Sequence, residues 1–218
     1  MIYTHNNLIL IEDIKDNLYL FKLREGIIFS YGFQGKDNKI QEKKISNRAS
    51  LEYDISIDNK NNIYIVYQDK NFHLVLLIKS GESIREIILT EEPLPEIINL
   101  SLEIIEDITH IFYNVLVEEK KYRIVHHYYN NSIWKTNLVE DIKINQVLNP
   151  MKILYNGEKL FLIYYNLENI YCKCFNINKG QWEEKIKITE NPKDKLYLDC
   201  LIIDGKLHLS YCDMMRNY

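Results

Sequence analysis

The stretch that decides the fold is Ile63-Tyr64-Ile65-Val66-Tyr67, a short apolar phrase ending in tyrosine. This phrase recurs along the chain with nearly constant spacing. Its further copies are Thr109-His110-Ile111-Phe112-Tyr113, Leu160-Phe161-Leu162-Ile163-Tyr164 and Leu207-His208-Leu209-Ser210-Tyr211. The tyrosines are 46, 51 and 47 residues apart, and a weaker copy at Leu18–Lys22 ends 45 residues before Tyr67. The chain therefore contains about five copies of one unit.

Each copy belongs to a group of short apolar segments separated by polar turns. The last copy, for example, follows Leu198–Ile203 and the turn Asp204-Gly205. Asp-Gly and Asn-Gly between strands favour type I′ hairpin turns, because both central positions of that turn need positive φ. A third and a fourth segment come after the phrase, as at Ile170–Phe175 and Trp182–Ile188. Four short strands every 45 to 51 residues predict the blades of a β-propeller.

We therefore expect a single all-β domain over residues 1–218, a β-propeller of four-stranded blades. The expected blades cover approximately residues 8–46, 50–91, 99–142, 150–190 and 197–218. The last blade stops about two strands short, and the N-terminus offers little to replace them, so we expect that the ring does not close by itself. Either the native protein continues past Tyr218, or the open blade pairs with another chain.

Two other architectures fit the repeat less well. A β-sandwich also contains short alternating strands, but it has no reason to repeat one tyrosine in register. An α-solenoid needs apolar residues at i, i+3, i+4 and i+7, whereas Lys185–Ile188 alternates with period two. The chain has a single alanine, Ala49, and its apolar residues are mainly the strand-favouring types.

Composition excludes several classes of partner. The net charge is -4, and acidic and basic residues are interleaved, so we expect no nucleic-acid partner. No apolar run reaches membrane-spanning length, and residues 1–7 lack the features of a secretory signal, so we expect a cytoplasmic protein without a membrane partner. The four cysteines lie in apolar segments of the last quarter, and we expect free thiols: Cys172, Cys174, Cys200 and Cys212.

Two stretches resemble the repeats of sialidase-like propellers: Gly205–Asp213, and Gly180-Gln181-Trp182 at the start of a fourth strand. The resemblance covers almost the whole chain and implies the propeller fold. The chain departs from that family in lacking a Ser-x-Asp-x-Gly-x-x-Trp box and an Arg-Ile-Pro segment. None of its arginines occupies a repeat position that suggests a three-arginine carboxylate clamp: Arg24, Arg48, Arg85, Arg123 and Arg216.

The repeat tyrosines are the candidate ligand-binding residues: Tyr67, Tyr113, Tyr164 and Tyr211. Their rings could stack on sugars. A side chain that recurs at one strand position in every blade usually packs between neighbouring sheets instead, with its hydroxyl on a nearby carbonyl. Recurrence favours packing, and ligand binding is the alternative.

The histidines and cysteines suggest no metal site. His126 and His127 are adjacent in an expected strand, so their side chains point to opposite faces. His110 and His208 occupy an aromatic position of the repeat, which favours packing. A Cys-x-Cys pair can hold a thiophilic metal, but a zinc site needs four ligands, so we expect Cys172 and Cys174 to be small buried apolar residues.

Adjacent carboxylates are expected in solvated turns or on opposite faces of a strand, where they form no acid and base couple: Glu12, Asp13, Glu106, Asp107, Glu183 and Glu184. Because nothing supplies a nucleophile with its base, we expect a non-catalytic binding or scaffolding propeller without a cofactor. Its ligand would be a protein or a glycan, and the incomplete last blade would allow self-association. The alternative is a sialidase-like glycan-active enzyme or a lectin, suggested by the resemblance and by 26 aromatic residues, 17 of them tyrosine.

Overall fold

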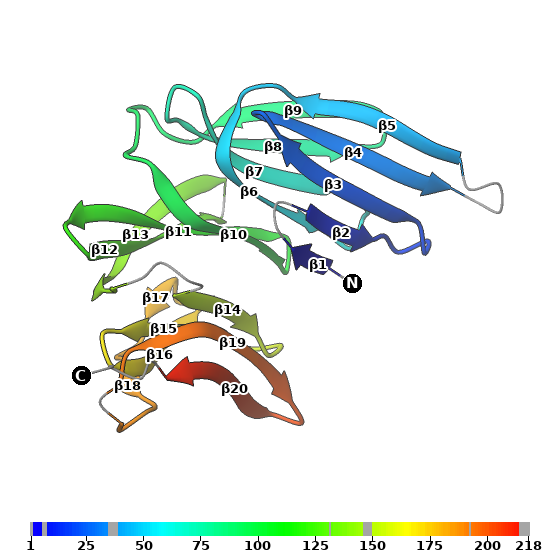
Figure 1. Cartoon of the computed structure of the whole chain (residues 1–218). Coiled ribbons are helices and arrows are strands. Elements are labelled where there is room, and N and C mark those ends of the chain that lie inside the picture. Colours follow the sequence, from blue (N-terminus) through cyan, green and yellow to red (C-terminus); the bar gives the residue numbers. More distant parts are fainter. Residues whose placement is uncertain are drawn as a thin grey trace. The chain divides into compact units, whose positions relative to one another are not determined.

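A computed structural model describes residues 2–5, 8–34, 39–130, 132–145, 150–191 and 193–213. Every regular element over these ranges is a β-strand, and the strands form sheets that follow one another along the chain (Figure 1). Within the same ranges, no helix has the length and apolar character needed to cross a membrane.

The first two sheets occupy the N-terminal half. The first has the order β1 to β5, with strands β1 (Ile2–His5), β2 (Leu8–Glu12), β3 (Leu18–Arg24), β4 (Ile27–Gln34) and β5 (Lys39–Ser46). The second is four-stranded, with strands β6 (Ala49–Ile57), β7 (Ile63–Asp69), β8 (Leu74–Ser80) and β9 (Ser83–Ile88).

Three further sheets follow. The third is again four-stranded, with strands β10 (Ile97–Ile105), β11 (Ile108–Glu118), β12 (Lys121–Asn130) and β13 (Ile133–Lys143). The fourth contains β14 (Met151–Tyr155), β15 (Leu160–Asn166), β16 (Asn169–Asn176), β17 (Gln181–Trp182) and β18 (Ile186–Lys187). The fifth pairs β19 (Lys195–Ile203) with β20 (Lys206–Asp213).

The repeat phrase lies in one strand of each sheet, as the spacing predicts: β3, β7, β11, β15 and β20. The expected continuous strand over Trp182–Ile188 is wrong, because it is interrupted between β17 and β18. Both short strands pair with β16, but Phe175 faces Trp182 and Cys172 faces Ile186, so the outer strand holds one residue more than β16 does over this stretch. Such an extra residue interrupts the ladder.

The predicted turn chemistry is confirmed at one site and wrong at another. Asp204 and Gly205 have φ values of 49° and 71°, as a type I′ turn requires. At Asn156-Gly157 only the glycine has positive φ. The connection between β14 and β15 is longer than two residues, and the Asn156 side chain accepts hydrogen bonds from the Glu158 and Lys159 amides.

Aspartate side chains organise two equivalent turns, between β2 and β3 and between β6 and β7. Asp13 accepts hydrogen bonds from the Lys15 and Asn17 amides, and Asp58 accepts them from the equivalent amides in its own turn. Asn61 links the two turns, because it accepts from the Ile14 amide at 3.1 Å and donates to Asp13 Oδ2 at 3.1 Å. The turns of the first and second sheets are thereby joined.

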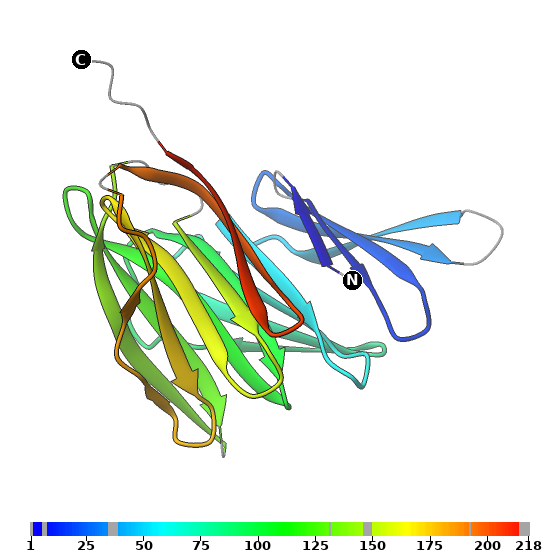
Figure 2. The same cartoon turned by 90° about the horizontal axis from the view of Figure 1, so that it is seen from below.

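The chain divides into two compact units. Unit 1 comprises residues 1–113 and 126–136, and unit 2 comprises residues 114–125 and 137–218. The unit 1 core packs between the first and second sheets around buried residues such as Ile11, Phe21, Ile28, Ile55 and Ile65. In unit 2 the β19–β20 hairpin lies beside β14 and β15 (Figure 2). The expectation of one domain with the stated blade limits stays a prediction.

The first long strand of several sheets is irregular. The β6 register shifts between Ala49 and Tyr53, and the β19 register shifts between Leu196 and Asp199. In β10, Asn99 has a φ of 56°. A bulge re-aims the side chains that follow it, which bears on the acidic residues of β6 and β10.

Candidate functional site

The repeat tyrosines are mostly buried. Tyr67, Tyr113 and Tyr164 are 0%, 2% and 0% exposed, and Tyr211 is partly exposed. Tyr164 stacks on Tyr171 with the ring centroids 5.8 Å apart, and the Lys195 ammonium lies 5.6 Å from the Tyr211 ring centroid. These contacts favour the packing interpretation. Ligand binding by these four tyrosines stays a prediction.

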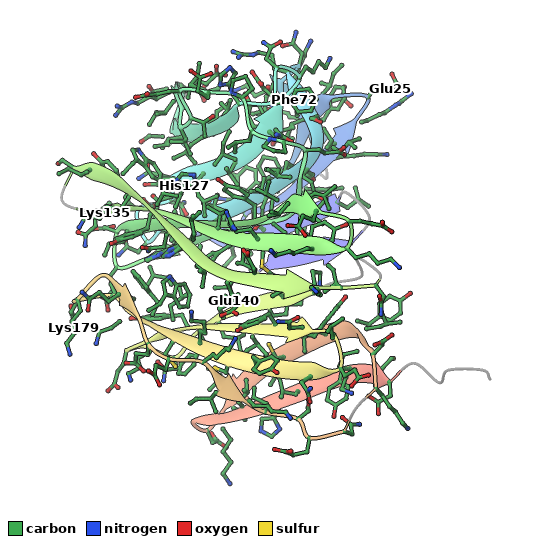
Figure 3. The ribbon with its side chains drawn as sticks, turned by 90° about the vertical axis from the view of Figure 1, so that its left-hand side faces the viewer. Glu25, Phe72, His127, Lys135, Glu140 and Lys179 are labelled. Carbon is green, nitrogen blue, oxygen red and sulfur yellow. The ribbon has the colours of Figure 1, made fainter. Side chains whose placement is uncertain are left out.

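The Tyr113 hydroxyl is hydrogen-bonded to a buried histidine of β12, His127. Figure 3 labels this histidine. The hydroxyl lies 2.9 Å from His127 Nε2, and the Thr136 hydroxyl lies 2.7 Å from Nδ1. Burial lowers the pKa of His127 to about 4, so the ring is neutral at pH 7. A neutral imidazole has one donor and one acceptor nitrogen, and both are satisfied here.

The opposite face of β12 carries a stack of aromatic rings. His126 lies parallel to Phe112 at 4.3 Å, and its Nε2 is 3.0 Å from Nδ1 of His110. The predicted opposite orientation of His126 and His127 is therefore confirmed, as is the packing role of His110. The packing prediction is wrong for His208, which is exposed on β20 of the two-stranded sheet.

Three acidic residues lie where β6 and β10 meet, and we call them the carboxyl face: Glu52, Asp54 and Glu103. The two strands are neighbours within unit 1. Glu52 accepts a hydrogen bond from the Leu100 amide at 3.3 Å, and Asp54 accepts one from the Leu102 amide at 2.7 Å. These carboxylates thus satisfy backbone donors of β10.

Glu103 differs from its two neighbours. It is half-buried and makes no hydrogen bond or ion pair with any other described residue. Burial, and then the nearby Asp54 carboxylate, raise the pKa of Glu103 to about 8. At pH 7 Glu103 therefore carries its proton beside an ionised Asp54. Paired carboxyl groups whose environments drive their pKa values apart are frequent at functional sites.

The sequence gives little signal for this cluster. Glu52 and Asp54 alternate with Tyr53 and Ile55, and Glu103 follows Leu102, which is the pattern of a strand with one solvated face. Only the approach of β6 to β10 brings the three carboxyl groups together. Reasoning from adjacent acidic pairs could not find residues that lie about 50 positions apart.

Several of the acidic pairs singled out from the sequence have turn or surface roles. Asp13 holds its own turn. Glu106 and Asp107 form the turn between β10 and β11, with φ values of 51° and 64°. Asp107 pairs with Lys60, and Glu183 pairs with Lys159 at 3.0 Å. The solvated-turn interpretation is confirmed for Glu106, Asp107 and Glu183 and is wrong for Asp13, whose side chain is buried in its turn.

The described arginines do not converge on a ligand. Arg48 lies 2.8 Å from Asp69 and 2.7 Å from Glu86, and Arg123 pairs with Asp141. Arg24 pairs with Glu25 at 3.7 Å, and Arg85 is exposed. Arg216 lies outside the described residues. The described part of the chain thus contains no three-arginine clamp.

All four cysteines are free thiols, as predicted. The expected burial of Cys172 and Cys174 is confirmed; Cys200 is also buried, and Cys212 is exposed. It lies on β20 among exposed residues of the two-stranded sheet. Over the described ranges, no group of three or more histidine, cysteine or acidic side chains is arranged to hold a metal ion.

Comparison with known proteins identifies the fold. No protein-family model matches the chain, and no curated protein matches it. A mutant of AofleA from Arthrobotrys oligospora superposes with a TM-score of 0.57 at 11% identity, over 95% of this chain and 65% of that one. The polysaccharide lyase Uly1 gives 0.57 at 13% identity, over 94% and 55%.

The NanB sialidase from Streptococcus pneumoniae gives a TM-score of 0.52 at 12% identity, over 87% of this chain and 36% of that one. The chain thus spans less than two thirds of each of these structures. Identities this low identify a fold and not an activity. The resemblance to sialidase-like propellers is confirmed at the level of the fold, which is all-β and propeller-like.

Proposed function

We propose that this chain is a non-catalytic, carbohydrate-binding propeller whose ligand site is the carboxyl face. One observation carries the proposal: Glu103 retains its proton beside the Asp54 carboxylate and has no hydrogen-bond partner among the described residues. A sugar hydroxyl both donates and accepts a hydrogen bond. A protonated carboxyl donates and a carboxylate accepts, so the pair matches this requirement.

Charge favours a neutral glycan. The acidic side chains of the carboxyl face disfavour a sialic acid carboxylate, and three of the described arginines already pair with acidic side chains. Among the similar folds, a polysaccharide lyase and a sialidase are carbohydrate-active by name. This supports a glycan ligand over a protein ligand.

The experiment is a glycan array followed by calorimetric titration of the best neutral glycan. Glu103→Gln keeps a donor and cannot ionise, so we expect it to bind at pH 6 like the parent. The parent should lose affinity above pH 8, as Glu103 ionises, and the variant should not. Glu103→Ala should weaken binding about tenfold, the equivalent of one hydrogen bond. Glu183→Gln removes an acidic charge elsewhere and should change nothing. Unaltered binding by Glu103→Ala would refute the site.

A glycan-active enzyme is the second candidate, favoured by the same pair. A protonated carboxyl beside a carboxylate is the arrangement of acid-catalysed glycoside hydrolysis. Asp54 already accepts a hydrogen bond from the Leu102 amide, which fixes the carboxylate in place and occupies one of its acceptor positions, and this favours binding over turnover. A panel of fluorogenic glycosides separates the two: binding without release supports the binding role, and release lost in Asp54→Asn supports the enzyme.

We also propose that the chain forms five blades and that a second copy completes the β19–β20 blade. Supporting this, the hairpin exposes Leu201, Ile203 and Leu207 by 48%, 49% and 38%. Among the described residues β20 pairs with β19 alone, so its outer edge offers backbone groups to a strand of a second copy, whose side chains would cover part of this apolar surface. Light scattering should give a mass above 26.2 kDa that rises with concentration. Leu207→Lys should restore the monomer. A parent that is monomeric at all concentrations would contradict self-association.

A further inference from the structure

Three thiols of β16 and β19 are buried within unit 2. Cys172 and Cys174 lie two residues apart on β16, so they share one face of the strand. The Cys172 thiol lies 3.9 Å from the Lys173 carbonyl oxygen, and each of the two thiols shifts the pKa of the other. Lys173, between them, points to the other face and donates to the Val139 carbonyl at 2.9 Å. The thiol pair and the lysine thus lie on opposite sides of the sheet.

Cys200 joins the pair from β19. Its thiol interacts electrostatically with that of Cys172. All three residues are only 8 to 9% exposed. Cys212 is exposed on β20, opposite Leu196 in the ladder, whereas Cys200 lies opposite Leu209. Unit 2 therefore contains a buried pair of thiols, a third buried thiol within electrostatic range of Cys172, and an exposed fourth thiol that serves as a control.

Burial favours the neutral form of these thiols when no ion is bound. It raises the pKa of Cys172 to about 12 and that of Cys200 to about 11, so both are thiols at pH 7. The nearby lysines are already offset, because Lys159 pairs with Glu183 and Lys152 pairs with Asp199. A monovalent cation between two thiolates leaves one negative charge where the ion-free thiolates would carry two, so the cation lowers the cost of burying them.

We propose that Cys172 and Cys174 bind one soft monovalent cation, Cu(I) or Ag(I), with Cys200 as a nearby third sulfur. Thiolates select such ions over hard cations. Two S–H bonds break, two sulfur–metal bonds form and two protons leave to solvent, with no change of oxidation state. Two-coordinate binding needs only the pair. The absence of a three-ligand arrangement among the described residues argues against a tetrahedral zinc site. This inference is independent of the carboxyl face.

The test is an anaerobic titration of the whole chain with Ag(I), and with Cu(I) against a competing chelator. Native mass spectrometry should count one tightly bound ion per chain, and a pH-stat should record two protons released. X-ray absorption of the loaded parent should show a first shell of sulfur only. A shell containing nitrogen or oxygen would overturn the assignment without any substitution.

Matched variants locate the ion. Cys172→Ser and Cys174→Ser should each abolish the tight site, whereas Cys212→Ser should leave it intact. Cys200→Ser should weaken binding by about tenfold, the usual effect of a neighbouring supporting group. Melting curves of the free variants check that each is folded. If the Cys172→Ser/Cys174→Ser double variant binds the ion as tightly as the parent, or if only Cys212→Ser loses it, the proposal is wrong.

Discussion

Tyr67 on β7 and Tyr113 on β11 occupy the same position of the repeat, yet their hydroxyl groups have different partners. Both rings are buried. The Tyr67 hydroxyl accepts from Ser46 at 3.2 Å and donates to Glu86, whose side chain is 36% exposed. The Tyr113 hydroxyl meets buried His127. The repeat therefore specifies the ring, and each sheet supplies its own hydroxyl partner.

The difference determines how each site depends on water. Water can replace the Tyr67 hydroxyl as a hydrogen-bond partner of Glu86, which also pairs with Arg48. His127 Nε2 has no such exchange, because its ring is enclosed. The two tyrosines should respond alike when the ring is removed and differently when only the hydroxyl is removed.

Removing the ring should have the largest effect. Tyr67→Ala, Tyr113→Ala and Tyr164→Ala should each lower the free energy of unfolding by about 3–5 kcal/mol, the cost of truncating a buried aromatic. Urea denaturation measures this. Tyr211→Ala should cost less, because Tyr211 is partly exposed. A Tyr164→Ala protein that melts like the parent but loses a ligand would reverse the packing interpretation.

Acidification should lower the stability of the protein through the buried histidines of β11 and β12, the strands that hold Tyr113 and its partner. Burial lowers the pKa of His110 and His127 to about 4, from an ordinary 6.5. Between pH 4 and 6.5 the unfolded chain binds more protons, so these groups make stability rise with pH there and fall on acidification. The melting temperature over this range should show the slope, and His127→Gln should reduce it. An unchanged slope would exclude His127 as a source.

Glu103 should make stability fall with rising pH, the opposite of the histidine effect. Its pKa is raised from 4.5 to about 8, so the folded chain binds the extra proton and its stabilisation is lost as pH rises through 8. Above pH 6.5 the histidines no longer change the stability with pH. The melting temperature should therefore peak near pH 6.5 and decline towards pH 8. Glu103→Gln should flatten the decline. A melting temperature that still rises from pH 6.5 to 8 would contradict the raised pKa.

Removing only the hydroxyl should separate the two tyrosines. Tyr113→Phe leaves His127 Nε2 buried without its partner and should cost about 1–3 kcal/mol. Tyr67→Phe should cost about 0.5–1.5 kcal/mol, because Glu86 remains solvated. Parallel denaturation curves compare them. Equal costs would mean that water reaches His127 once the tyrosine hydroxyl is gone.

The smallest loss of stability is expected at Thr136, the exposed member of the hydrogen-bonded group Tyr113, His127 and Thr136. Thr136 is exposed, so water can replace its hydroxyl at His127 Nδ1. Thr136→Val should therefore cost about 0.5–1 kcal/mol, and Thr136→Ser close to nothing. Nitrogen NMR shifts of His127 report the tautomer in each variant. A Thr136→Val cost as large as that of Tyr113→Phe would show that Nδ1 is as enclosed as Nε2.

Local patterns predicted the strands well. The phrase ending at Tyr67 and its copies combine period-two alternation with turn residues, and both signals act within a few positions. The break between β17 and β18 was not predictable in this way, because it depends on the register of Trp182 and Ile186 against β16. Register is a property of paired strands, not of one segment.

Sites that depend on neighbouring sheets were not predictable. Glu103 meets Asp54, and Cys200 meets Cys172, only because consecutive sheets pack against each other. Alternation says which face a residue occupies, but not which residue of the next sheet lies opposite. The adjacent pairs chosen from the sequence, such as Glu183 and Glu184, lie on a single strand or turn and could not reveal such contacts.

The linked aspartate turns bear on how such a chain can grow. Asn61 joins its turn to that of Asp13, 48 residues earlier, and Lys60 of the same turn bonds Asp107, 47 residues later. Both hydrogen bonds come from side chains of the single turn between β6 and β7. A tandem duplication of the gene segment that encodes one unit would therefore also duplicate the side chains that bond the two neighbouring units, so such a chain could change its number of units without first evolving new contacts.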